Sequence, residues 1–237
     1  MSEEEVRLRD AMPRPLLAVF AVLAIAGLAA TVALLIRPPQ AAEVPLAERR
    51  PAARAPYDHD PIEVFPAPVP EEIPAFRAPC EEVAGARPEG GPSFVARVRD
   101  AMSLICGVAK GGPDAELTRA ARAFDGVTIR IAEFARSGIE STLDEDARVV
   151  WVNLKLTARQ RTATELAPVL LHEAVHLLEP GGTAAIELRA RRVEDAACRT
   201  FLRPADRPFW CQDAAAIIAL PEPEALALLA AAGFPPA

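Results

Sequence analysis

An uninterrupted apolar run near the start of the chain places the strongest constraint on its fold. The run from Leu16 to Ile36, LLAVFAVLAIAGLAATVALLI, contains no charged side chain. A helix needs about 20 apolar residues to cross the ~30 Å hydrocarbon core of a bilayer, whereas a cleaved signal peptide usually has about 7–15. The run therefore predicts a retained transmembrane helix over residues 16–36, after a short tail at residues 1–15.

Proline is concentrated in the segment that follows this run. It recurs every few residues from Arg37 to Pro79, and alanine and charged residues fill most of the remainder. Proline at this density removes amide donors and favours an extended backbone. We therefore predict a semi-rigid linker over residues 37–79 and a folded domain over residues 80–237.

The cysteines and charges indicate where this domain is located. All four cysteines follow the apolar run, and disulfides form in oxidising compartments. Arginines flank the run on both sides, so the positive-inside rule does not decide the orientation. We expect a single-pass membrane protein with a cytoplasmic N-terminus and an exported domain, periplasmic or extracellular; a cytosolic domain with four buried thiols is the alternative. The net charge of −7, with no basic cluster, argues against a nucleic-acid partner.

Hydrophobic periodicity predicts an α+β domain. Two segments have the alternation and β-branched composition of strands, and the polar segment SGIESTLDEDA between them predicts a connection. The expected strands are 127–132 and 148–156, and the expected helices are 92–108, 114–124, 162–179, 183–202 and a broken segment within 214–232.

The predicted helix over residues 162–179 carries the residues with the clearest chemistry. His172 and His176 are four residues apart, so their imidazoles leave the same face and could bind one tetrahedral metal ion. Glu173, the next residue after the first histidine, could accept a proton from a water molecule activated by zinc, whose pKa falls to about 7. The alternative is an ordinary helix that carries two histidines without a ligand.

The stretch His172-Glu173-Ala174-Val175-His176 resembles the H-E-x-x-H motif of the zincin metallopeptidases. The resemblance covers about residues 149–201 and implies a zinc-dependent peptidase with a peptide or protein substrate. It also implies that the preceding strand, Arg148 to Leu156, is the sheet edge that binds substrate in extended form.

The resemblance further implies a third zinc ligand after the motif. The metzincin branch uses a third histidine, but the only other histidine of this chain is His59, in the predicted linker. The gluzincin branch uses a carboxylate on the next helix. We expect Glu194, in VEDAAC, to be this ligand, with Glu187, in IELRA, as the alternative and Asp195 as a further candidate.

Two features depart from the gluzincin pattern. The usual tyrosine or histidine that stabilises the oxyanion has no counterpart in the predicted domain, so an arginine such as Arg189, Arg191 or Arg199 could replace it. Cys198 stands where the family carries Asp or Asn after the ligand. It could pair with Cys211, leaving Cys80 to pair with Cys106, which is one of three possible pairings.

Two functions therefore remain open. The first is a membrane-anchored zinc metallopeptidase with His172, His176 and Glu194 or Glu187 as ligands and Glu173 as the general base. The second is a catalytically silent zinc-binding or protein-interaction domain on a membrane stalk. The complete motif favours the first, because a purely structural zinc site has no use for Glu173.

Overall fold

The computed structural model describes residues 64–112, 114–135, 139–153 and 162–236. All of them belong to one of the two units into which the chain divides, Arg54–Ala237. The predicted tail, the predicted transmembrane helix over residues 16–36 and most of the predicted linker lie outside these residues. No helix in the described part is both long enough and apolar enough to cross a membrane.

The described residues form six α-helices, two short 3-10 helices and a five-stranded mixed sheet, which confirms the predicted α+β class. The strands are short, and the helices contain more of the described residues than the strands do. In chain order the elements are β1 Val64–Pro66, the 3-10 helix η1 Glu81–Val83, β2 Arg87–Glu89, α3 Pro92–Ala109, α4 Ala115–Ala120, β3 Thr128–Phe134, β4 Ser141–Asp144, β5 Val149–Asn153, α6 Ala163–Leu178, α7 Ala184–Phe201, η2 Pro204–Asp206, α8 Phe209–Ile218 and α9 Glu222–Ala231.

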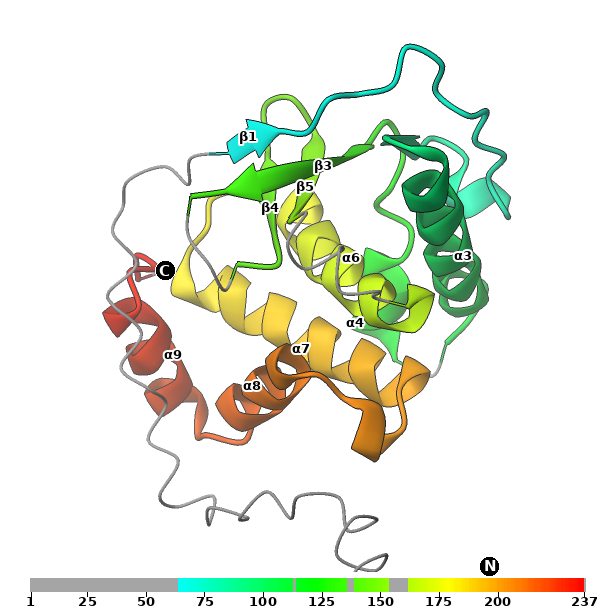
Figure 1. Cartoon of the computed structure of the whole chain (residues 1–237). Coiled ribbons are helices and arrows are strands. Elements are labelled where there is room, and N and C mark those ends of the chain that lie inside the picture. The colour runs from blue at the N-terminus through cyan, green and yellow to red at the C-terminus, as the bar shows by residue number, and fades with distance from the viewer. Residues whose placement is uncertain (1–63, 113, 136–138, 154–161, 237) are drawn as a thin grey trace, which may run out of the picture. The chain divides into compact units, whose positions relative to one another are not determined.

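Strand β3 organises the sheet (Figure 1). Two strands share one of its edges: β1 runs antiparallel to it, with Val64 opposite Phe134, and β2 runs parallel to it, with Arg87 opposite Thr128. On its other edge β3 pairs in parallel with β5, and β5 pairs antiparallel with β4. Among the described residues, β4 is therefore the edge strand on this side of the sheet.

The expectation that Arg148–Leu156 forms a substrate-binding edge is wrong for the described part of that segment. Strand β5 lies between β3 and β4, and its hydrophobic run fits a strand that is paired on both sides. The edge is β4, inside the segment predicted to be a polar connection. Four residues with little apolar content give too weak a pattern for periodicity to reveal a strand. Residues 154–156 lie outside the described part.

The folded domain also begins before the predicted boundary at Cys80. Strand β1 lies within the predicted linker but pairs with β3, and Phe76 packs against the main core. Pro66 is compatible with this strand, because an edge strand can leave one backbone position without a donor.

The predicted helices are present, with local signals at their starts. Thr162 and Glu165 form a capping box before α6, and the Asp114 carboxylate accepts a hydrogen bond from the backbone N–H of Leu117 at 2.9 Å, before α4. Helix α4 ends at Ala120, short of the predicted Phe124, and the C-terminal pair begins at Phe209, before the predicted start.

Helix α6 occupies the centre of the described domain. Its apolar face, which includes Leu166, Leu170 and Leu171, is fully buried in the main core between the sheet and the neighbouring helices. Figure 1 shows the sheet, α6 and α7 as successive layers, with α8 and α9 against the far side of α7. The polar side chains of α6 are therefore held by a rigid, buried scaffold.

Two disulfides fasten this arrangement. Cys80 pairs with Cys106 of α3, and Cys198 of α7 pairs with Cys211 of α8, which confirms that the cysteines form two bridges. The second bridge lies in a buried cluster with Val169, Leu202 and Trp210. It thus fixes α8 against the helix that follows the H-E-x-x-H segment.

Candidate metal centre

Helix α6 presents both histidines of the motif from its last turns. Their side chains are 12% and 13% exposed for His172 and His176, so each imidazole has a buried body and a path to solvent. Four-residue spacing places both rings on one face, with their centroids 5.2 Å apart. The buried apolar residues of the same helix fix this face toward α7.

A tight turn brings the next helix back alongside α6. Gly181 and Gly182 have φ values of 119° and 55°, in the left-handed region that glycine adopts without strain. Thr183 then caps α7 by accepting a hydrogen bond from the N–H of Ile186 at 3.4 Å. The first turn of α7, which carries Glu187, consequently lies beside the last turn of α6, which carries His176.

Three side-chain atoms converge at this point. Nε2 of His172 and Nε2 of His176 are 3.4 Å apart. Oε2 of Glu187 lies 3.6 Å from the first of these nitrogens and 3.4 Å from the second. These three residues form a group that could hold a metal ion.

The spacing of these atoms fits a small tetrahedral ion. Metal–ligand bonds of about 2.0–2.1 Å to zinc place the ligand atoms of a regular tetrahedron about 3.3–3.4 Å apart. The three observed separations, 3.4, 3.4 and 3.6 Å, lie at or just above that value. Two imidazoles and one carboxylate also leave the fourth position open, as in catalytic rather than structural zinc sites.

The structure favours Glu187 over Glu194 as the third ligand. Glu194 contacts the other nitrogen of the first histidine: its Oε2 lies 3.1 Å from Nδ1 of His172. With the proton on Nδ1, the ring donates to this carboxylate oxygen and could turn the lone pair of Nε2 toward a metal. Glu194 could thus orient this ring from behind if His172 binds a metal. Asp195 pairs with Arg199 and does not line the pocket.

Arg191 ties the two glutamates together. Its Nε donates to Oε1 of Glu187 at 2.7 Å, and its Nη1 donates to Oε2 of Glu194 at 3.0 Å. All three side chains are largely buried, so the guanidinium offsets charge that water cannot screen. Of the arginines considered for oxyanion stabilisation, Arg191 lines the pocket, whereas Arg189 pairs with Glu179.

Glu173 is buried and is held by a residue that the sequence analysis did not single out. Its side chain is 5% exposed, and its Oε1 accepts a hydrogen bond from Oγ of Ser141 at 2.5 Å. Ser141 opens strand β4, 32 positions earlier in the chain. A four-residue strand within a polar segment gave no signal that this serine would meet the motif.

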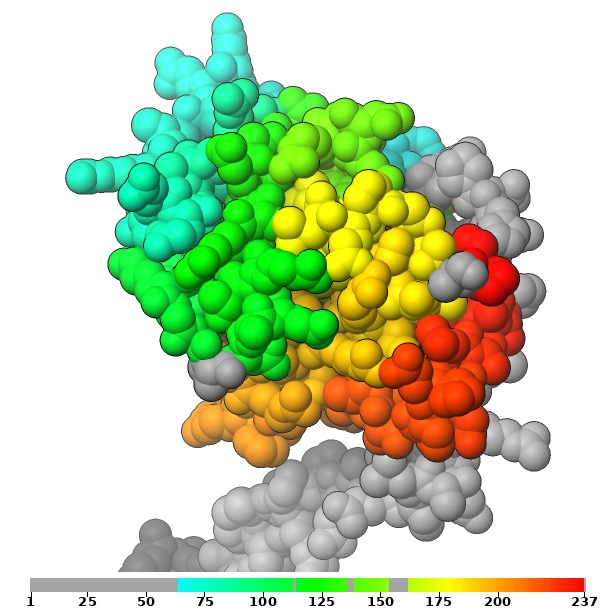
Figure 2. Space-filling model, turned by 180° about the vertical axis from the view of Figure 1, so that it is seen from behind, coloured from blue at the N-terminus to red at the C-terminus, as the bar shows by residue number. Residues whose placement is uncertain are grey.

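A cavity of about 240 Å³ connects these groups to solvent. Strand β4 forms one wall and the two helices form another, while Phe234 from the C-terminal segment contributes an apolar side. The backbone N–H of Ala184 donates to the carbonyl of Pro235 at 2.8 Å, which fixes this segment at the start of α7. Figure 2 shows the red C-terminal segment beside the yellow surface formed around α6 and the following turn.

Without a metal, the electrostatics of the centre favour a protonated His172 beside an ionised Glu187. Burial lowers the pKa of His172, but the carboxylates of Glu187 and Glu194 outweigh it and raise that pKa to about 10. Burial alone would raise the pKa of Glu187, yet Arg191 and His172 hold it well below its usual value. A divalent cation would replace the proton that His172 carries in this cluster.

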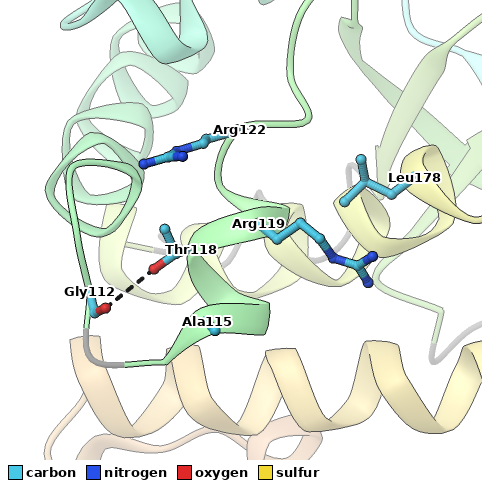
Figure 3. Close-up of a pocket in the computed structure, with 6 residues that line it drawn as sticks. All are labelled: Gly112, Ala115, Thr118, Arg119, Arg122 and Leu178. Atoms are coloured by element: carbon cyan, nitrogen blue, oxygen red, sulfur yellow. Dashed lines mark hydrogen bonds between the residues drawn. The ribbon is translucent and has the colours of Figure 1, made fainter.

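A larger hollow of about 550 Å³ lies elsewhere, between α4 and the end of α6 (Figure 3). Its polar groups already have partners within the protein: Arg122 donates to the carbonyl of Ala109, and Arg119 pairs with Glu179 at 2.5 Å. Thr118 donates to the carbonyl of Asp114 at 2.8 Å, and its Oγ1 lies 3.4 Å from the carbonyl oxygen of Gly112. This hollow shares no lining residue with the cavity at the metal centre. Although it is larger, it does not contain the candidate metal ligands.

Comparisons with protein-family models, with curated proteins and with solved structures gave no match to this chain.

Proposed function

We propose that this chain is a zinc-dependent metallopeptidase of the zincin type. The observation that carries the proposal is the spacing of Nε2 of His172, Nε2 of His176 and Oε2 of Glu187, which matches the edges of a zinc tetrahedron. The buried carboxylate of Glu173 beside them supports a catalytic site, because a structural zinc site would need a fourth ligand instead.

Zinc is the metal that this donor set fits best. Two imidazole nitrogens and one carboxylate oxygen are typical ligands of catalytic zinc, whereas Mg²⁺ and Ca²⁺ prefer oxygen ligands alone. Bound there, zinc would supply a Lewis acid for a water molecule and for a carbonyl oxygen.

The protein's own residues would move the protons. Glu173 accepts a proton from the attacking water as its oxygen bonds to the carbonyl carbon of the substrate. The carboxylic acid so formed returns this proton to the amide nitrogen as the C–N bond breaks. The second proton of the water passes from the new carboxyl group to the amine, so Glu173 ends ionised and the products are a carboxylate and an ammonium group.

Strand β4 is suited to bind an extended peptide. The backbone N–H of Asn153 donates to the carbonyl of Glu140 at 2.9 Å, so these two residues form a hydrogen-bonded pair of the antiparallel ladder. Along the ladder, hydrogen-bonded and non-hydrogen-bonded pairs alternate. By this alternation the backbone N–H and C=O groups of Ser141 and Leu143 face away from β5, and both residues also line the cavity. A substrate strand could pair with them beside the metal centre.

The proposal includes an exported, membrane-anchored location. Two disulfides within the described domain support an oxidising compartment. The apolar run over residues 16–36 supports an anchor with a cytoplasmic N-terminus.

The first test measures metal content and hydrolysis on the full-length chain, purified in detergent. We expect about one zinc per chain by mass spectrometry and none in His172→Ala. Against a panel of unstructured peptides, Glu173→Gln should keep its zinc and lower kcat by about 100-fold or more. Glu224→Gln, at an exposed position of α9, is the matched control and should behave like the parent.

Two outcomes would contradict the proposal. Absence of zinc from the parent, even after reconstitution, would reject the metal centre. Full hydrolysis by Glu173→Gln would reject the mechanism. Bound zinc with no hydrolysis in the parent would favour the catalytically silent domain on a membrane stalk.

A further inference from the structure

Ser141 connects the edge of the sheet to the motif helix. Its Oγ donates to Oε1 of Glu173 at 2.5 Å, across 32 positions of sequence. Both residues line the cavity that contains the two histidines. The contact therefore joins an element suited to bind substrate with the group suited to move a proton.

The strand that carries Ser141 is itself held in place. Asn153, at the end of β5, is 1% exposed, and its side-chain amide donates to the carbonyl of Ile139 at 2.8 Å. Its backbone N–H donates to the carbonyl of Glu140. These bonds fix the chain immediately before Ser141, so the hydroxyl is presented from a rigid position.

The hydrogen bond has a directional effect on the carboxylate. A serine hydroxyl that donates to Oε1 restricts rotation of the Glu173 carboxyl group and leaves Oε2 as the oxygen that can receive a proton from water. Short hydrogen bonds from a hydroxyl to an ionised carboxylate are among the stronger ones in proteins. A buried carboxylate without such a donor would occupy several orientations, and only some of them would suit proton transfer.

The backbone of the same residue faces away from β5, where a substrate strand could pair with it. Alternation along β4 directs the N–H and C=O of Ser141 away from β5, while its side chain points to α6. A peptide that pairs with this edge would thus be aligned by the residue that also orients the base.

We propose that Ser141 is a positioning residue, which orients the carboxylate of Glu173 and aligns it with a substrate bound along β4. This inference rests on the proposed function. Ser141 does not contact the reacting atoms; it acts through Glu173 and through the strand.

The test compares three variants of the full-length chain in detergent: Ser141→Ala, Ser141→Thr and Ser141→Val. Threonine and valine have nearly the same shape, so this pair isolates the hydroxyl. We expect Ala and Val to lower kcat by about 10-fold to 100-fold with a much smaller change in KM. Threonine should restore most of the lost kcat, and zinc content should stay at the parental value in all three.

A second measurement does not depend on activity. With zinc bound, Ser141→Ala should lower Tm by roughly 3–10 °C, because a buried carboxylate loses a donor. In a Glu173→Ala background the same substitution should have little effect. This cycle tests the contact itself.

The possible results are distinguishable from failure of the proposed function. If the parent cleaves peptides and Ser141→Val matches Ser141→Thr in kcat, only the positioning role is overturned. Equal Tm losses in both backgrounds would overturn the contact. A zinc-loaded parent that cleaves nothing would overturn the proposed function and the positioning role together, and the Tm cycle would still decide whether the contact exists.

Discussion

Glu194 accepts a hydrogen bond from Nδ1 of His172 at 3.1 Å, while Glu187 approaches Nε2 of the same ring. One imidazole thus lies between two carboxylates that occupy opposite sides of the ring. The two glutamates share a helix and a residue type but differ in what they could do for a metal.

We therefore expect Glu187 and Glu194 to affect zinc binding to different degrees. Glu187→Ala removes a ligand and should abolish stoichiometric binding. Glu194→Gln leaves all three ligands in place and should weaken binding by about 10-fold to 100-fold, because the histidine loses its charged partner. Competition with a chromophoric chelator would measure both. The reverse order of effects would identify Glu194 as the ligand.

Zinc affinity should depend on pH. Glu187 and Glu194 overcome the effect of burial and raise the pKa of His172 to about 10, so this histidine is protonated in the metal-free chain at neutral pH. Binding must displace that proton, and the apparent affinity should rise about tenfold per pH unit between about pH 7 and 9. Titrations in metal buffers would measure the slope. An affinity that does not change over this range would contradict the raised pKa.

The same pKa predicts how the stability of the metal-free fold changes with pH. A folded-state pKa above the ordinary value of 6.5 means that protonation of His172 stabilises the folded state. This contribution is complete below about pH 6.5 and is lost as the pH rises through about 10. Urea unfolding with a chelator present, at pH 7 and at pH 10.5, should show the loss. In the control variant, His172→Gln, the part of this stability loss that comes from His172 should be absent.

Removal of Arg191 should destabilise the metal-free chain more than the zinc-loaded chain. Arg191→Met leaves two buried carboxylates without the guanidinium, which typically costs about 3–5 kcal/mol when a buried ion pair is broken. Bound zinc would restore part of the lost free energy of unfolding, because it supplies positive charge near Glu187. Chemical unfolding with and without a chelator would measure the difference. Equal losses in both states would show that Arg191 does not offset this charge.

The Cys198–Cys211 bridge should support the metal centre as well as the fold. It packs on Val169, which precedes His172 by one helical turn and also lines the cavity. The double variant Cys198→Ala/Cys211→Ala should lose about 2–4 kcal/mol of unfolding free energy and bind zinc more weakly. Cys80→Ala/Cys106→Ala is the matched control: it should lose stability but keep its zinc affinity. Unchanged zinc affinity in the first variant would contradict this coupling.

The local parts of the site could be predicted from sequence. Helical periodicity and the four-residue spacing of the histidines depend only on neighbouring residues, and both are present in α6. The choice between Glu187 and Glu194 could not be made in this way. They are two helical turns apart on similar faces, and only the tight turn at Gly181 and Gly182 decides which one meets the Nε2 atoms.

The non-local parts could not be predicted. Strands β1 and β4 have three and four residues, and pairing with β3 and β5 stabilises them rather than their own composition. The contact between Ser141 and Glu173 depends on that pairing, so no pattern within either segment indicates it.

The short turn between α6 and α7 has a consequence for the order of assembly. All three candidate ligand side chains, and Glu194 behind them, belong to a single helical hairpin. Contacts between segments so close along the chain cost little loop entropy and are favoured early in folding. The partner of Glu173 comes instead from a distant strand. If the chain binds the proposed metal, a nascent chain could therefore capture it before the sheet closes over the site, and Glu173 would gain its hydrogen-bond donor only when folding is complete.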